Sequence, residues 1–251
     1  MDELAVKFLK TYQVWHHRRL LLLITRKADQ ELAFIKKGLQ VDAKNYHTWS
    51  YRQWILAHFG GYGNVINDTI SDDAENSNKE DACDNSLWDG ELDFIESMLI
   101  NDIRNNSAWH HRFFVVWGCG IREGEEDHAH VFKRELTYVK HSISLVPNNP
   151  AAWNYLRGIL QHTARPFSSV RDFIRPYTLP APVSLEYRSR DIVDLENPPP
   201  AEDAELPVPA AIELMADIWE EEGTKEGLDK ASEVRIGFLK LAFHHAYFFS
   251  L

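Results

Sequence analysis

The sequence predicts an all-α fold, organised as a right-handed superhelix of antiparallel helical hairpins. Three observations lead to it: a Trp-centred motif that recurs four times, amphipathic stretches of helical period between the copies, and no clear strand alternation. The motif tryptophans are Trp15, Trp49, Trp109 and Trp153. Trp15 and Trp49 lie 34 residues apart, a period that suits a two-helix repeat.

Each motif places a capping residue before its tryptophan and, in three copies, an arginine after it. Asn45, Asn105 and Asn149 stand four residues before their tryptophans, and Thr11 takes this place in the first copy. A short side-chain acceptor there satisfies a first-turn N–H, so we expect these residues to cap the helices that follow. Tryptophan and an arginine three residues later share a helix face. We therefore expect the tryptophans to fill the interhelical core and the arginines to tie neighbouring segments.

The segments between the motifs supply the other helix of each hairpin. Residues 30–39 and 91–100 carry apolar side chains at helical steps. From Ala210 onward a second helical pattern begins, with an apolar stripe of Ile212, Met215, Ile218 and Trp219. These patterns predict helices that bury one face.

Two segments break the repeat, although we expect residues 1–251 to form a single α-solenoid domain. Residues 60–87 hold seven acidic residues against one lysine and few apolar side chains, which predicts an acidic disordered insertion. Residues 176–209 hold eight of the 11 prolines, which predicts a connection with little helix. The last residues, 238–251, are unusually apolar and aromatic.

Composition excludes several classes of protein. Hydrophobic residues make up 44% of the chain, so a disordered chain is excluded, and a net charge of −11 disfavours nucleic-acid binding. The longest aliphatic run, residues 20–24, is too short to span a membrane, and residues 1–10 lack a secretory signal pattern. Cys83 and Cys119 form no CxxC motif. The sequence therefore predicts a cytoplasmic protein without a membrane span or a disulfide framework.

Paired histidines are the only candidates for a metal site, at residues 16–17, 110–111 and 244–245. Adjacent residues on a helix diverge by about 100°, so the two rings of a pair do not share one ion easily. We therefore predict that this chain binds no metal itself.

The motifs resemble the repeats of protein prenyltransferase alpha subunits, above all the alpha subunit shared by farnesyltransferase and type I geranylgeranyltransferase. The segments that carry the resemblance are residues 12–19, 42–54, 105–109 and 145–160. They match in register from residue 10 to about residue 163, apart from the insertion. Against the family pattern, the chain begins within the helix before Lys10, and residues 242–251 differ from the expected basic, Trp-containing segment. The resemblance thus implies a chain truncated at its N-terminus and divergent at its C-terminus.

The resemblance implies an alpha subunit that wraps around a beta subunit, which holds catalytic zinc and the isoprenoid. The heterodimer would transfer a farnesyl or geranylgeranyl group from its diphosphate to a cysteine near the C-terminus of CaaX proteins, such as Ras-like and Rho-like GTPases. No cofactor is then expected on this chain, with zinc on the beta subunit and magnesium also serving the complex.

The same resemblance assigns roles to particular residues. Lys10 matches the catalytic lysine that reaches the diphosphate at the subunit interface. A lysine ammonium suits that role because breaking the allylic C–O bond leaves negative charge on the diphosphate. Four residues match the substrate-binding region: Tyr12, Gln13, Tyr46 and His47. Gln13 among them matches a glutamine that contacts the carboxylate terminus of the substrate. Arg18 and Asn45 match motif positions that shape the loops and the interface.

Two alternatives remain open. The first is the alpha subunit of the geranylgeranyltransferase that modifies Rab proteins, disfavoured because residues 10–15 fit the farnesyl-type pattern better. The second is a tetratricopeptide-like scaffold without catalytic duty, for which a 34-residue period is equally natural.

Overall fold

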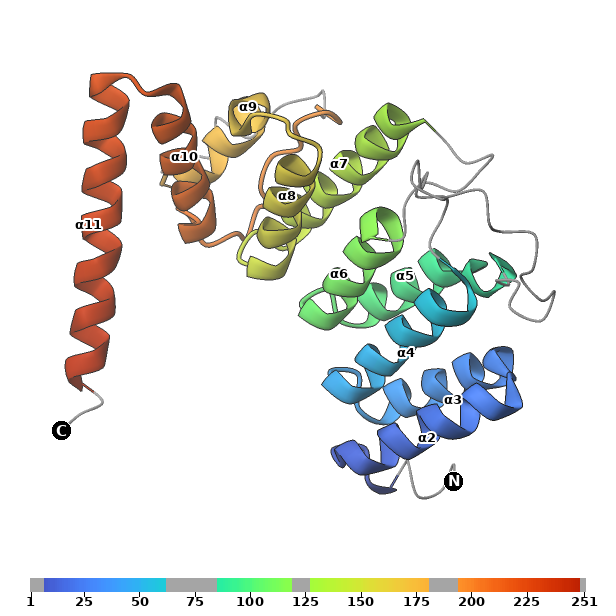
Figure 1. The fold of residues 1–251 in the computed structure, drawn as a ribbon. Coiled ribbons are helices and arrows are strands. Elements are labelled where there is room, and N and C mark those ends of the chain that lie inside the picture. Colours follow the sequence, from blue (N-terminus) through green and yellow to red (C-terminus); the bar gives the residue numbers. More distant parts are fainter. Residues whose placement is uncertain (1–6, 62–84, 119–126, 181–193, 249–251) are drawn as a thin grey trace, which may run out of the picture. The chain divides into compact units, whose positions relative to one another are not determined.

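The computed structural model describes residues 7–61, 85–118, 127–180 and 194–248, with the side chains of the last helix described to residue 237. The contacts group the chain into two compact units, residues 1–128 and 129–251, and each is described by itself. Every regular element in these ranges is helical, which confirms the predicted fold class (Figure 1). The prediction of one continuous solenoid domain stays a prediction.

Unit 1 consists of helices joined by short turns. The turns pair α3 with α4 and α5 with α6 as helical hairpins, while α2 precedes them (Figure 1). The elements of this unit are α2 (Tyr12–Thr25), α3 (Ala28–Val41), α4 (Tyr46–Phe59), the 3₁₀ helix η2 (Asn85–Trp88), α5 (Glu91–Asn101), α6 (Asn106–Phe113) and the π-helical turn η3 (Phe114–Gly118).

Unit 2 continues with a third hairpin, α7 with α8, and ends with the pair α10 and α11 (Figure 1). Asp217 on α10 forms ion pairs with Arg157 on α8 and Arg235 on α11, so one carboxylate ties three helices. The elements are α7 (His128–Leu145), α8 (Pro150–His162), η4 (Phe167–Val170), α9 (Arg171–Ile174), η5 (Arg175–Thr178), α10 (Pro209–Glu222) and α11 (Lys225–Phe248). None of the helices in the described ranges combines the length and apolar character that crossing a membrane requires.

The four motif tryptophans are buried in the core, as predicted. Within unit 1, Trp15 and Trp49 each contact an aromatic ring of the next hairpin. The ring centroids of Trp15 and Tyr51 lie 5.3 Å apart, and those of Trp49 and His111 lie 5.0 Å apart. Successive repeats are therefore joined by aromatic packing.

The predicted helix caps are also confirmed. The Asn45 side-chain oxygen accepts a hydrogen bond from the Thr48 N–H at 3.0 Å, and Asn105 and Asn149 accept equivalent bonds from their first turns. Thr11 makes no side-chain bond of this kind. The first of the four motif helices thus lacks the cap that the other three share.

The insertion is ordered at both edges, which differs from the prediction for residues 60–87. The indole N–H of Trp88 donates to the carbonyl oxygens of Gly60 and Gly61, at 3.1 and 3.0 Å. Leu87 is buried beside Trp88. Residues 62–84 lie outside the described residues, so their disorder stays a prediction.

The described parts of the Pro-rich segment, residues 176–180 and 194–209, contain little helix, and the second part is bonded to α7. The Lys140 ammonium donates to the Glu196 carbonyl at 3.0 Å and to the Asn197 side-chain oxygen at 3.1 Å. The Ser144 hydroxyl donates to the Pro199 carbonyl. Burial lowers the pKa of Lys140, against the raising effect of nearby carboxylates. Residues 181–193, and the side chains of the apolar C-terminal segment from residue 238 onward, lie outside the described residues.

We expect Asn105→Ala to lower the free energy of unfolding by about 1–3 kcal/mol, because it removes a helix cap and a part-buried hydrogen bond to the turn before α4. Urea denaturation measures this change. Asn106→Ala is the matched control, since Asn106 is exposed one position further along. Equal losses in the two variants would contradict the capping role.

Candidate functional site

Apart from Arg18 within α2, the predicted site residues lie on the turns that precede α2 and α4 and on the first residues of these two helices. We call these two segments and the equivalent one before α6 the turn edge (residues 8–13, 42–47 and 102–107). Each motif tryptophan fixes its own turn by one repeated bond. The indole N–H donates to the carbonyl oxygen six residues earlier in all four motifs: to Leu9 at 2.8 Å, Ala43 at 2.9 Å, Ile103 at 2.8 Å and Pro147 at 2.7 Å. The next residue along the chain therefore occupies the same place on every turn.

That place holds a cation on each of the three turns of unit 1. The residues are Lys10, Lys44 and Arg104, and all three are exposed. The tryptophan bond holds the backbone just before each cation, so the cations stand at fixed points along the turn edge. Asn148 takes the equivalent place in unit 2.

Neighbouring turns of unit 1 are joined to one another. The side-chain amide of Asn105 donates to the Ala43 carbonyl at 3.0 Å, and the Lys44 ammonium lies 2.9 Å from a carboxylate oxygen of Asp102. The hydrogen bond from Lys44 holds the pKa of the Asp102 carboxyl below its usual range. This pair is exposed, so it orients Lys44 more than it stabilises the fold.

The first turn packs against the end of α3 and the start of α4. A Cβ placed on Gly38 of α3 would lie 3.9 Å from the Leu9 side chain and 3.5 Å from that of Thr48. Leu9 is buried there. Because Leu9 precedes Lys10, this packing places the first turn beside the turn that carries Asn45 and His47.

The structure leaves most predicted binding residues open to solvent. Lys10, Tyr12, Gln13 and Tyr46 are exposed, and His47 is half-buried. Their ring contacts are local: Tyr46 meets His47 edge-on at 5.6 Å, and Tyr12 stacks on His16 at 6.0 Å. Within the described residues no hydrogen bond or ion pair joins Lys10 to the second turn.

Arg18 and Asn45 make contacts within the fold, and their predicted roles in shaping the loops and the interface stay predictions. Asn45 is the cap of α4, and Arg18 is buried with two hydrogen bonds to the Glu31 carboxylate, at 2.6 and 2.9 Å. The Arg18 guanidinium also lies 3.7 Å from the Phe34 ring centroid. Arg18 thus ties α2 to α3.

Glu31 belongs to a repeated set of glutamates that the sequence analysis did not single out. Each stands on the first helix of a hairpin and accepts from a Tyr or His 20 residues later on the second helix. The pairs are Glu31 with Tyr51 at 3.3 Å, Glu91 with His111 at 3.0 Å, and Glu135 with Tyr155 at 2.6 Å. A signal was present in the sequence, because Glu-Leu-x-(Phe/Tyr)-(Ile/Val) recurs at residues 31–35, 91–95 and 135–139.

Glu91 is the most buried of the linked carboxylates in unit 1, and it meets two partners. Burial opposes its ionisation, but hydrogen bonds from His111 and from Arg52 outweigh burial and hold the pKa of Glu91 below its usual range. Burial lowers the pKa of His111 despite Glu91. His111 is therefore neutral and donates through Nε2, while its Nδ1 has no hydrogen-bond partner in the described chain.

Three consecutive hairpins match one family model. The model of the protein prenyltransferase alpha subunit repeat matches residues 28–59, 88–118 and 132–163, which correspond to α3 with α4, α5 with α6, and α7 with α8. The chain belongs to the protein prenyltransferase alpha-subunit family. The matched segments contain the motif tryptophans 49, 109 and 153 and the three glutamates of the repeated set, 31, 91 and 135.

Curated relatives of this alpha-subunit chain include both types of alpha subunit. It is 26% identical over 159 residues to the geranylgeranyl transferase type-2 subunit alpha of Saccharomyces cerevisiae, covering 61% of this chain and 42% of that protein. It is 35% identical over 74 residues to the protein farnesyltransferase/geranylgeranyltransferase type-1 subunit alpha of Dictyostelium discoideum, covering 30% of this chain and 22% of that protein. The aligned part spans less than half the length of each of these relatives.

A solved structure shares the fold. Candida albicans protein geranylgeranyltransferase-I complexed with GGPP superposes with a TM-score of 0.63 and 24% sequence identity, covering 93% of this chain and 63% of that chain. At this identity the likeness supports the alpha-subunit fold alone.

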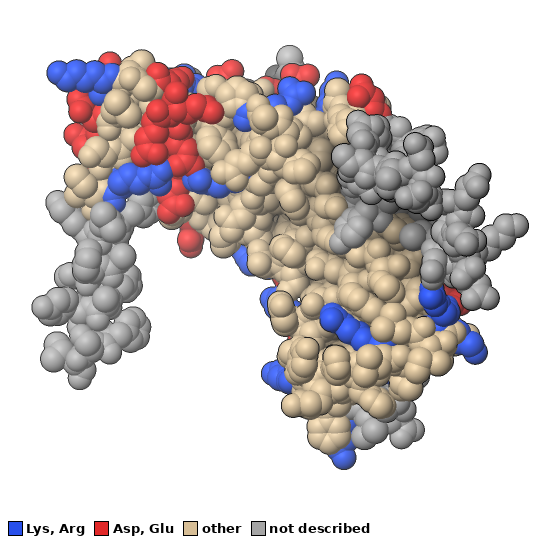
Figure 2. All heavy atoms as spheres, viewed as in Figure 1, with Lys and Arg blue, Asp and Glu red and all other residues tan. Residues whose placement is uncertain are grey.

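Charge is unevenly spread over the alpha-subunit chain. On the face shown in Figure 2, carboxylates gather over α10 and the start of α11, whereas Lys and Arg prevail on unit 1. Exposed members of the acidic group are Glu220, Glu221, Glu222 and Glu226. In the described residues no group of three or more His, Cys, Asp or Glu side chains is placed to hold a metal ion.

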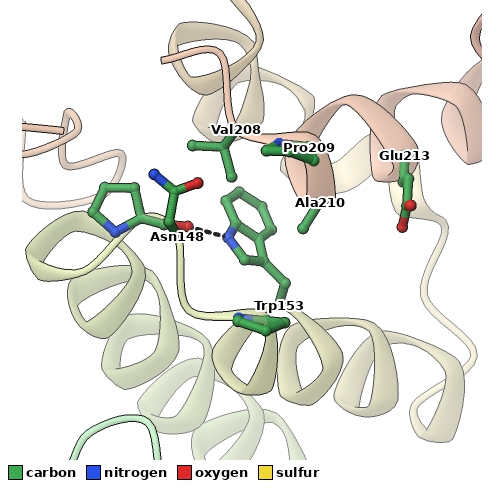
Figure 3. Close-up of a pocket in the computed structure, with 8 residues that line it drawn as sticks. Asn148, Trp153, Val208, Pro209, Ala210 and Glu213 are labelled. Carbon is green, nitrogen blue, oxygen red and sulfur yellow. Dashed lines mark hydrogen bonds between the residues drawn. The ribbon is translucent and has the colours of Figure 1, made fainter. Parts of the chain in front are cut away.

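The turn before α8 is bonded to a neighbouring segment, although Asn148 on it is exposed. A pocket of about 290 Å³ lies there (Figure 3). Its lining is Pro147, Asn148, Pro150, Trp153, Val208, Pro209, Ala210 and Glu213. The Asn148 amide donates to the Glu205 carbonyl at 3.0 Å, which fixes the chain leading into α10 over this turn. The pocket is mainly apolar and presents no cation.

We expect Glu91→Gln to lower the free energy of unfolding by about 3 kcal/mol, because it leaves the buried Arg52 guanidinium without a charged partner. Thermal and urea denaturation measure the change. Glu96→Gln on the exposed side of α5 is the control and should change stability by less than about 0.5 kcal/mol. An unchanged free energy of unfolding in Glu91→Gln would contradict a stabilising network around Glu91.

We expect the stability to fall as the pH decreases from about 7 to about 5. His111 has a folded-state pKa below its ordinary value of 6.5, so the unfolded chain binds a proton that the folded chain does not. His111→Tyr should remove this part of the pH dependence, since tyrosine fills the same place in α4 and α8. His110→Tyr, at an exposed neighbour, should keep it. Urea midpoints across this pH range provide the measurement.

Proposed function

We propose that this chain acts as the alpha subunit of a heterodimeric protein prenyltransferase, with the turn edge of unit 1 bordering the reaction and Lys10 assisting the diphosphate. The observation that carries the proposal is the match of three consecutive hairpins to the alpha-subunit repeat, together with an exposed Lys10 on a turn fixed by Trp15. The reaction would transfer a prenyl group from its diphosphate to a protein cysteine.

The chemistry of the turn edge fits the departure of a diphosphate. Negative charge grows on the leaving group as the allylic C–O bond breaks, and a cation held at a fixed point stabilises that charge without reorganising. The Trp15 bond to Leu9 and the packing of Leu9 hold the backbone on which Lys10 stands. Tyr12 and Gln13, on the first turn of α2, offer hydrogen bonds to substrate oxygens and amides. His47 and Tyr46 extend the same edge to the second turn.

The proposal requires a partner surface. An exposed ammonium interacts weakly with a phosphate in water and much more strongly once water is excluded. A beta subunit packed over the turn edge would exclude water and supply the remaining groups. Zinc on that subunit would generate the thiolate nucleophile near neutral pH, and magnesium would serve the diphosphate. In the complex, the residues of this chain bind and orient the diphosphate and the substrate tail.

The proposed enzyme is the farnesyltransferase or type I geranylgeranyltransferase, acting on CaaX proteins such as Ras-like and Rho-like GTPases in the cytoplasm. Residues 10–15 support this choice by their pattern, and the Dictyostelium type-1 relative supports it by 35% identity over its aligned part. The second candidate is the Rab geranylgeranyltransferase. It is favoured by the likeness to the geranylgeranyl transferase type-2 subunit alpha of Homo sapiens. The two chains are 27% identical over an aligned part that covers 60% of this chain and 23% of that protein.

The test is co-expression with a prenyltransferase beta subunit from the same source, followed by size-exclusion chromatography and prenyl-transfer assays. We expect a one-to-one complex that prenylates a CaaX peptide, and in Lys10→Ala we expect kcat to fall about 10²-fold without loss of the complex. Lys36→Ala, at an exposed lysine of α3, is the matched control. Transfer to a Rab protein but not to the CaaX peptide would favour the second candidate. A stable complex with no transferase activity would favour a scaffold.

A further inference from the structure

The pocket of unit 2 lies between the turn before α8 and the start of α10 (Figure 3). Its volume of about 290 Å³ is at the lower end of the range for ligand sites, which is roughly 300–1,000 Å³. A cavity of this size suits a single side chain of a partner better than a large ligand. The turn is the counterpart of those that carry Lys10, Lys44 and Arg104, but no lysine or arginine lines the pocket.

The walls of the pocket are apolar, and hydrogen bonds fix them. The Trp153 side chain is 1% exposed, and its indole N–H is already bonded to the Pro147 carbonyl at 2.7 Å. Val208 is buried, and its backbone N–H donates to the Tyr177 carbonyl at 2.8 Å. Further walls are proline rings, whose backbone is restricted and which offer no N–H. The pocket is therefore formed before any ligand arrives, which lowers the cost of binding.

Two polar side chains line the pocket, and both offer hydrogen-bond acceptors. The Asn148 amide donates to the Glu205 carbonyl at 3.0 Å, which leaves its side-chain oxygen as an acceptor. Within the described residues no hydrogen bond or ion pair engages that oxygen or the half-buried Glu213 carboxylate. In Figure 3 Asn148 and Glu213 lie at the two sides of the Trp153 ring. The pocket thus calls for a ligand with several N–H donors and a positive charge.

The segment that leads into α10 adds negative charge at the rim of the pocket. Asp203 and Glu205 are exposed, and the bond from Asn148 holds the Glu205 backbone beside the pocket. A basic peptide segment can place one cation in the pocket and further cations along these outer carboxylates. A small free cation would not reach them, so the charge pattern favours a peptide.

We propose that this pocket receives one arginine side chain of a basic peptide segment from a partner protein. The aliphatic stem of the arginine packs on the apolar walls. The guanidinium pairs with the Glu213 carboxylate and donates a further N–H to the Asn148 side-chain oxygen. Arginine fits better than lysine, because its N–H donors form a fixed fork that serves two acceptors at once, whereas an ammonium is a point charge. The site lies in unit 2 and stands apart from the proposed function of the turn edge.

The test uses the whole chain and a fluorescein-labelled peptide, Gly-Lys-Gly-Arg-Gly-Lys-Gly, in which lysines flank the central arginine. Fluorescence anisotropy should show saturable one-to-one binding that weakens as the salt concentration rises. Norleucine in place of the arginine should weaken binding at least about tenfold, because the Glu213 carboxylate loses its charged donor. Lysine in its place should weaken binding several-fold. Free N-acetylarginine amide should compete only at much higher concentration than the unlabelled peptide.

Glu213→Gln should weaken binding about tenfold, because it removes the charge of the pocket. Its urea midpoint should stay unchanged, since the Glu213 carboxylate has no partner within the described residues. Glu233→Gln is the matched control, because Glu233 is an exposed glutamate of α11 outside the pocket and its substitution changes the net charge equally. The control should alter the affinity less than about twofold. Ala210→Leu narrows the pocket without a change of charge, and it should weaken binding several-fold.

Equal losses in Glu213→Gln and Glu233→Gln would overturn the proposal, because the peptide would then be held only by general attraction to an acidic chain. Undiminished binding of the norleucine peptide, or no saturable binding up to about 1 mM peptide, would overturn it too. Competition by N-acetylarginine amide as strong as that by the peptide would assign the pocket to a small guanidinium compound instead. A dimer of the chain that Glu213→Gln dissociates in sedimentation would show that the occupant is a second copy, against the proposal.

Discussion

The hydrogen bond from each motif tryptophan to the carbonyl oxygen six residues earlier is the constraint on which the rest of the structure depends. The indole ring fills the space between helices, and its N–H reaches the turn that leads into its own helix. One side chain therefore both fills the core and fixes the backbone of the turn. Because the bond recurs at the same spacing, the turns have a common geometry, and any side chain placed after the bonded carbonyl occupies a defined point on the edge.

The buried carboxylates determine the register in which neighbouring helices pack. Glu31 and Glu91 each receive an arginine from the preceding motif helix and a Tyr or His from the following one. A buried charge is costly unless every partner is in place, so a shifted packing of these helices would leave the glutamate and the arginine unpaired. The aromatic contacts stabilise the hairpins, and the polar contacts exclude alternative arrangements of them.

This division leaves the turn edge free for function. The core contacts involve the inner faces of the helices. Lys10, Lys44 and Arg104 lie outside the core, on turns whose backbone the core tryptophans fix by hydrogen bonds. A cation on such a turn costs little stability because it remains solvated. In unit 2 the same place carries Asn148, which is exposed and hydrogen-bonded to the chain leading into α10. Among the described residues, the turns that carry a cation at this place are thus confined to unit 1.

The sequence by itself determined the helical class, the buried tryptophans and the asparagine caps, because each depends on residues within one or two helical turns. The assignment of Lys10, Tyr12, Gln13 and His47 came from resemblance to a family, and their exposure fits it without testing it. The partners of Arg52 and Trp88 were decided only by the tertiary structure. Arg52 meets a glutamate 39 residues away, and Trp88 binds carbonyls across the insertion. Local periodicity describes which side of a helix is apolar, but only packing between distant segments decides which residues that side meets.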